Sequence, residues 1–176
     1  MRTETAAYHA KVDARFTALL RRGKPGYCEF LRLTWAAIYP LEQALIDANV
    51  ERILPDWSQR FRTAALYADL ADLGLDNQPT GRRPSIGGEA YQFGVLYVLE
   101  GSRLGARILR RDLMLPTPGA FRYLRHGEGL PLWRTFVKRL EASKAVRLSP
   151  EDAIAGAEAA FAYFDTDEPL VTDSGH

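Results

Sequence analysis

Apolar residues recur at intervals of three and four along this 176-residue chain, from its first residues to about Phe164. This spacing gathers them on one face of an α-helix, whereas the strict alternation typical of a half-buried strand is nearly absent. Hydrophobic residues make up 47% of the chain, which is enough to build a sizeable core. We therefore predict an all-α fold, and a chain of this length fits one domain.

Clusters of proline and glycine divide the chain into segments, because these residues end helices. A loop is expected over 76–86 and a turn over 126–129. The tail, 166–176, is acidic and lacks periodicity, so we expect a domain over 1–165 and a flexible C-terminal tail. Helices are expected at about 3–21, 27–48, from 56 to 74, 87–114, 131–145 and 150–164, with a short element at 121–125.

Charge and composition exclude several classes of partner. Lys and Arg number 23 against 22 Asp and Glu, so no overall field attracts nucleic acid. Four arginines in one short stretch, Arg103, Arg107, Arg110 and Arg111, are interpreted as a solvated helix face. No apolar run is long enough to cross a bilayer or to act as a signal peptide. The single cysteine, Cys28, excludes an internal disulfide, and we predict a cytoplasmic protein that does not bind membranes.

Of three histidines, only His9 lies inside a convincing helix. It shares an apolar helix face with Val12, Phe16 and Leu20. Asp13 follows one turn later, a spacing that lets a carboxylate accept a hydrogen bond from Nδ1–H and leaves Nε2 for a metal. An axial heme ligand requires this arrangement. The alternative is a core or boundary histidine with an incidental partner.

The segment 87–114 carries Gly94, Gly101 and Gly105, although alanine at each position would stabilise a helix by up to ~1 kcal/mol. Small residues at 101, 102, 105 and 106 line one side of this helix. A flat ligand could press against the backbone there, and the glycines would permit a kink. The alternative is tight helix–helix packing through small residues.

Other classes of site are poorly supported. The sequence contains no phosphate-binding loop of the Walker type, no His-Glu-x-x-His motif and no Gly-x-Ser-x-Gly elbow. His126 is interpreted as a surface turn residue. Four carboxylates, Glu29, Glu42, Asp69 and Glu100, lie on different predicted helices and could meet in a di-metal site. That kind of site normally needs Glu-x-x-His motifs, which are missing.

Several blocks resemble motifs of the heme oxygenase family, in particular the bacterial branch that includes the enzymes paired with bacteriophytochromes. Residues 5–13 (TAAYHAKVD) are similar to the proximal-helix motif of that family. Residues 97–106 (YVLEGSRLGA) are similar to its distal-helix motif. Residues 126–127 with 132–136, and residues 159–164, resemble later helices of the same family. The resemblance therefore extends over nearly the whole chain.

This resemblance implies a single-domain helical bundle of about seven to eight helices. It implies that His9 is the iron ligand, with Asp13 beside it. It also implies anchors for the heme propionates at Arg2 and Tyr97. The catalytic distal face would consist of Gly101, Ser102 and Gly105.

The activity that the resemblance implies is oxidative cleavage of heme, with O2 and electrons, to biliverdin, Fe2+ and CO. Heme is then both cofactor and substrate, and an external electron donor such as a ferredoxin or a reductase is a required partner. A bacteriophytochrome is a further partner of this family branch. Two alternatives stay open: a non-catalytic heme-binding or heme-sensing protein of the same fold, and a helical interaction module without heme.

Overall fold

The computed structural model describes residues 3–79, 82–112 and 121–165, with the backbone alone for 106–112. All regular structure within these ranges is helical, which confirms the predicted all-α helical bundle. Arg2 and the predicted tail, 166–176, lie outside the described residues. The elements are α1 (Ala6–Leu20), α2 (Lys24–Asp47), η1 (Val50–Arg52), η2 (Trp57–Gln59), α3 (Thr63–Asp72), α4 (Glu89–Asp112), α5 (Arg122–Arg125), α6 (Leu132–Ala142), α7 (Lys144–Leu148) and α8 (Pro150–Asp165).

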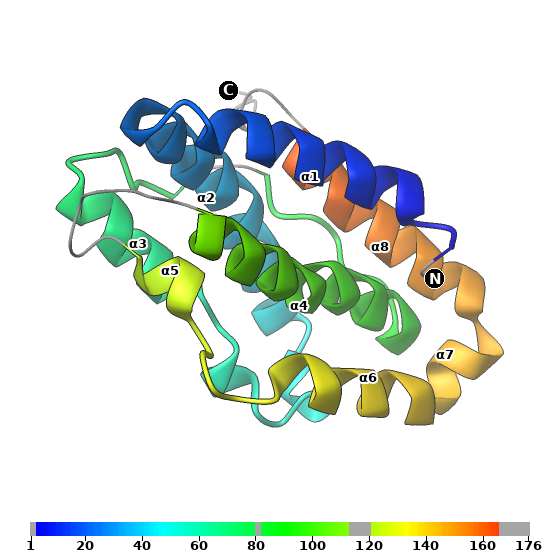
Figure 1. Ribbon diagram of the computed structural model, residues 1–176. Helices are drawn as coiled ribbons and strands as arrows, with labels where there is room; N and C mark the ends of the chain where they lie inside the picture. The colour runs from blue at the N-terminus through cyan, green and yellow to red at the C-terminus, as the bar shows by residue number, and fades with distance from the viewer. Residues whose placement is uncertain (1–2, 80–81, 113–120, 166–176) are drawn as a thin grey trace, which may run out of the picture.

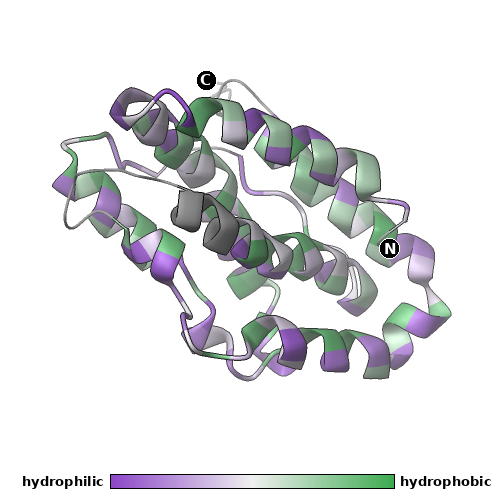
Figure 2. Cartoon of the chain, viewed as in Figure 1, coloured by the Kyte–Doolittle hydropathy of each residue, from purple (hydrophilic) through white to green (hydrophobic). Residues whose placement is uncertain are grey.

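Helix α4 lies at the centre of the bundle and makes its most extensive contacts with α8 (Figure 1). Helix α1 runs along α8 on one side, and α6 leads through α7 into α8 at the opposite edge. Apolar and polar residues mix along α1 and α6, as expected of helices with one face on the core (Figure 2). Among the helices that the structure describes, none combines the length and hydropathy needed to span a membrane.

Several helix boundaries differ from the prediction for local reasons. The helix expected from residue 56 begins only at Thr63, because residues 57–59 form the separate 3-10 helix η2. Helix α2 begins before residue 27, because Gly23 takes a φ of 69° ahead of it and Pro25 stands in the first turn, where its missing N–H costs little. The helix expected over 131–145 is two helices with a break at Ser143. The Ser143 hydroxyl accepts a hydrogen bond from the Val146 N–H at 3.3 Å and so caps α7.

Glycines bring α4 and α8 into direct backbone contact. A Cβ atom on Gly94 would lie 2.0 Å from the carbonyl oxygen of Ala153, and one on Gly156 would lie 2.1 Å from that of Tyr91. No side chain fits at either position, so helix packing explains Gly94. Of the three glycines in α4, Gly94 is therefore required by helix packing.

We predict that Gly94→Ala destabilises the protein although alanine favours helices. The added methyl must push two backbones apart, and overpacking of this kind costs about 3 kcal/mol. Gly105→Ala, in the same helix, is the matched control, since its Cβ would meet only an Asp13 oxygen at 3.9 Å. The control should gain up to about 1 kcal/mol. Urea unfolding measures both, and equal stabilities would contradict the packing explanation.

Candidate active site

A cavity of about 630 Å3 lies between α1 and α4 and is closed at its sides by α2, α5, α6 and α8. Its volume falls within the ~300–1,000 Å3 of pockets that enclose a small-molecule ligand. All the predicted site residues that the structure describes line it: His9, Asp13, Tyr97, Gly101, Ser102 and Gly105. Sequence positions almost a hundred residues apart are thus brought to one cavity.

The His9 imidazole is half-buried and lies between two aromatic rings. Its centroid is 4.7 Å from that of Phe161 and 6.0 Å from that of Tyr97, with interplanar angles of 79° and 77°. Both contacts are edge-to-face, the arrangement that the ring quadrupoles favour. These rings restrict the orientation of the imidazole.

Helix α1 is attached to α8 near the C-terminal end of α8. The Lys11 ammonium forms an ion pair with Asp165, and the Arg15 guanidinium donates to the Phe164 carbonyl oxygen at 2.9 Å. Tyr8 stacks on Phe161 at 5.6 Å between centroids. Helix α8 therefore sets the position of the helix that carries the histidine.

Asp13 is exposed at the edge of the cavity, and its carboxylate turns toward α4. One oxygen lies 3.9 Å from the position that a Cβ on Gly105 would take. This carboxylate oxygen therefore lies on the side of the cavity formed by α4. The hydrogen bond expected between Asp13 and the imidazole stays a prediction.

The wall opposite the histidine is made by Gly101. A Cβ there would lie 3.7 Å from the Trp133 ring and 3.9 Å from Cε1 of His9. An alanine methyl would thus be in van der Waals contact with the imidazole, so glycine keeps this part of the cavity open. The remaining walls are mostly apolar, and include Val12, Phe16, Phe30, Leu104, Phe161 and Phe164.

A buried ionic network binds Glu100 and Arg103 of α4. The Glu100 carboxylate, 1% exposed, accepts from Arg60 Nη1 at 2.6 Å and from Arg103 Nη2 at 3.0 Å. Arg60 also donates to Asp56 at 2.7 Å. Arg103 is 7% exposed, so its interpretation as part of a solvated helix face is wrong. The side chains of the other three arginines of that run lie outside the description.

The predicted residue Ser102 is held by another buried arginine, Arg62. The Arg62 guanidinium donates to Ser102 Oγ at 2.9 Å and to the Leu99 carbonyl oxygen at 2.8 Å, and the Ser102 hydroxyl donates to the same carbonyl at 2.7 Å. Sequence reasoning missed Arg62, because an arginine between two apolar stretches has no pattern that predicts burial. The segment of α4 beside the cavity is thus fixed by a buried cation from the loop before α3.

The carboxylates considered for a di-metal site bind protein donors instead. Glu42 accepts from the backbone N–H groups of Arg62 and Thr63 and from the Thr63 hydroxyl, and Asp69 accepts from the Tyr123 N–H at 2.9 Å. Burial raises the pKa of Glu42, an effect that Arg62 and these hydrogen bonds oppose. Among the residues that the structure describes, no group of three or more His, Cys, Asp or Glu could hold a metal ion.

His126 is half-buried, which differs from the predicted surface turn residue. Its Nδ1 lies 3.0 Å from Arg103 Nη1. Because a guanidinium only donates, Nδ1 must accept, and a neutral imidazole carries its proton on Nε2. Burial, with the charges of Arg103 and Arg62, lowers the pKa of His126 to about 4.

We predict that His126 makes stability depend on pH between about 6.5 and 4. Its pKa is lower in the folded state, so the unfolded state binds more protons in this window. The contribution is fully present above pH 6.5 and is lost as the pH falls toward 4. His126→Gln can still accept from Arg103 but does not titrate. Urea unfolding at several pH values should show a smaller loss of stability for the variant, and equal losses would exclude this role.

The chain has clear relatives, although no protein-family model matches it. A heme oxygenase of Xanthomonas campestris pv. campestris (strain 8004) is 37% identical over 146 residues, which make up 80% of this chain and 87% of that protein. The chain belongs to the heme oxygenase family. The NO- and CO-bound heme oxygenase of Neisseria meningitidis, a crystal structure, is similar in fold with a TM-score of 0.75 and 26% identity, over 93% of this chain and 85% of that one.

Membership of the heme oxygenase family confirms the resemblance noted in the sequence. It also confirms the expected enzyme class, a heme-degrading oxygenase. The helical bundle is the fold that the Neisseria enzyme shares. The roles of individual residues in this heme oxygenase are inferred below from their positions in the cavity between α1 and α4.

Proposed function

We propose that heme would bind in the cavity between α1 and α4, where His9 would hold its iron, and that it is cleaved there to biliverdin, Fe2+ and CO. One observation carries this proposal: a single apolar cavity has the imidazole on one wall and Gly101 on the other. When bound, heme supplies both the ring that is cleaved and the iron that activates O2. The protein supplies binding, orientation and exclusion of water.

On the α1 wall, the edge-to-face contacts with Phe161 and Tyr97 hold the His9 imidazole, whose neutral form is the one that binds a metal. Asp13 lies one turn further along α1, a spacing from which a carboxylate can reach the imidazole. We assign it the role of orienting His9 once the cavity is filled. Tyr97, with Arg2 near the start of the chain, is proposed to anchor the propionates.

On the α4 wall, Gly101 and Gly105 leave space beside the backbone, where a larger side chain would cover the ring. Ser102 is the polar group between them, and its hydroxyl is held by Arg62 and the Leu99 carbonyl. A hydroxyl fixed in this way can still accept a hydrogen bond from water. We propose that these three residues form the catalytic distal face, which limits what can approach the ring and keeps a water molecule there.

The reaction also consumes O2 and electrons. We propose that an external donor, such as a ferredoxin or a reductase, delivers the electrons, and that the enzyme acts in the cytoplasm, where its single cysteine stays reduced. A bacteriophytochrome that takes up the product is a further proposed partner. Mixing the purified protein with heme, a reductant and O2 tests the activity directly: a heme spectrum that persists without biliverdin would favour a heme-binding protein.

We predict that His9→Ala lowers the rate of heme cleavage at least about 100-fold, equivalent to ~2.7 kcal/mol. The fold should survive, because the apolar face of α1 is unchanged. Added imidazole should restore the axial ligation that the heme absorption spectrum reports. Unchanged turnover, with the wild-type spectrum and no added imidazole, would exclude His9 as the ligand.

We predict that Gly101→Leu weakens heme binding about tenfold or more, since its side chain would extend from a Cβ already in contact with His9 and Trp133. The control is Gly88→Leu, because a Cβ on Gly88 meets open space ahead of α4. Hemin titration followed by absorbance gives both dissociation constants. Equal constants for the two variants would place heme elsewhere.

A further inference from the structure

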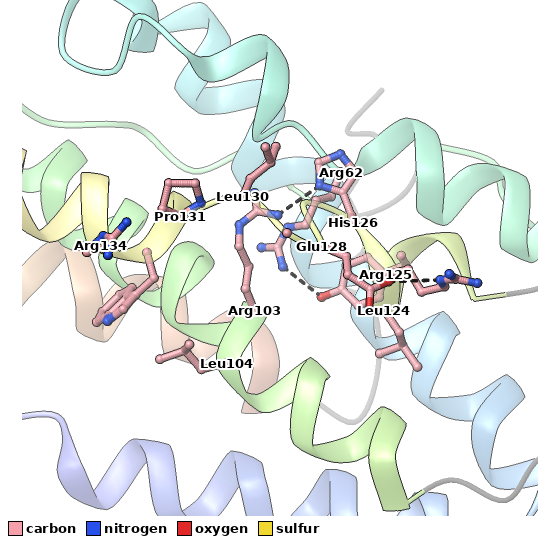
Figure 3. A pocket seen from close by; sticks show the side chains of 13 residues that line it. Arg62, Arg103, Leu104, Leu124, Arg125, His126, Glu128, Leu130, Pro131 and Arg134 are labelled. Atoms are coloured by element: carbon pink, nitrogen blue, oxygen red, sulfur yellow. Dashed lines mark hydrogen bonds and ion pairs between the residues drawn. The ribbon is translucent and has the colours of Figure 1, made fainter.

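A second cavity, of about 710 Å3, adjoins the one between α1 and α4 (Figure 3). It lies between α4, the 126–131 turn and α6. Leu104, Tyr123 and Trp133 line both cavities, so the two share part of their walls. Side chains rotate more readily than helices move, and a flexible ligand in the first cavity could therefore reach the second.

The inner end of this second cavity is lined by two buried arginines whose carboxylate partners are distant or shared. Glu128 also lines the cavity and forms an ion pair with Arg125 at 3.2 Å. Arg62 is 1% exposed, and its terminal N–H groups donate to uncharged oxygens; the Glu42 carboxylate approaches only Nε, at 3.9 Å. Arg103 shares the Glu100 carboxylate with Arg60. Burial, together with the charge of Arg62, lowers the pKa of Arg103 to about 10. An anion in this cavity would relieve that repulsion.

Two further side chains that can donate hydrogen bonds line this cavity, His126 and Arg134. Arg103 occupies Nδ1 of His126, which leaves the Nε2–H of the neutral imidazole as a donor. Arg134, on α6, is exposed at the mouth and has no carboxylate partner among the described residues. Guanidinium groups pair with carboxylates in a bidentate manner, so these positions suit a carboxylate ligand.

The other walls are apolar. Leu104 and Leu130 are 40% and 42% exposed, large fractions for leucine, and Trp133 lies beside them. A small inorganic anion would leave this surface in water. The walls and the arginines together fit a ligand with an apolar body and a carboxylate arm.

We propose that this second cavity receives a propionate arm of the ring-opened tetrapyrrole, and so acts as a product subsite. The inference rests on the proposed function, because the first cavity must hold heme. A closed porphyrin is rigid and planar, whereas the opened chain can turn about its bridges and extend past Leu104 and Trp133. The subsite would therefore distinguish product from substrate.

The test compares binding of biliverdin and of heme to two charge reversals on α6. Arg134→Glu places a negative charge at the mouth, and Arg139→Glu is the matched control, exposed on the same helix and lining neither cavity. Arg134→Glu should weaken biliverdin binding about tenfold and change heme binding less than about twofold. The control should change neither. Thermal unfolding confirms that both variants fold.

Biliverdin dimethyl ester, in which both propionates are uncharged, should bind the wild type at least as weakly as biliverdin binds Arg134→Glu. Equal affinity of ester and acid, or of wild type and Arg134→Glu, would overturn the proposal. A third outcome is that succinate stabilises the wild type but not Arg134→Glu, while the ester and the acid of biliverdin bind with equal affinity. This outcome would show a site for free carboxylates and would also overturn the proposal. Loss of the proposed function would appear separately, as wild-type protein that does not cleave heme.

Discussion

The backbone contact between α4 and α8 is the constraint on which the rest of this structure depends. Gly94 and Gly156 let the two helices touch without intervening side chains. Further along, α8 carries Phe161 against His9, and α4 carries Gly101 on the opposite wall. Because α8 also attaches α1 through Lys11 and Arg15, one pair of helices positions both walls of the cavity.

The buried ions behind α4 have a similar effect on its other side. Burying charge is expensive unless partners are well placed, and removing one member of such a network leaves an uncompensated buried charge. Arg60 and Arg103 meet on Glu100, and Arg62 fixes Ser102 and the Leu99 carbonyl. A helix with three glycines would otherwise be easy to bend. The arginines of the loop before α3 thus restrict bending of the α4 segment that contains Gly101 and Gly105.

Much of the fold was predictable, because helix periodicity and glycine–proline breaks are local signals. The site was predictable where residue type carries the chemistry, as for His9 and Gly101. Glycine spacing could not separate Gly94, which packs on α8, from Gly101, which borders the cavity, since only the neighbouring helix distinguishes them. Arg62 and Arg103 were missed or misjudged, because burial of a cation depends on partners from distant segments. The break at Ser143 depends on a single capping hydroxyl.

Helix α1 buries only Phe16 and Leu20 of its fifteen residues, both in its C-terminal half. The half that carries His9 is therefore the part of the cavity wall that can separate with the least loss of buried surface. A flat apolar ligand between α1 and α4 would supply packing that the helix lacks on its own. Ordering of α1 and occupancy of the cavity are then thermodynamically linked, so a bound ligand stabilises the helix that carries His9.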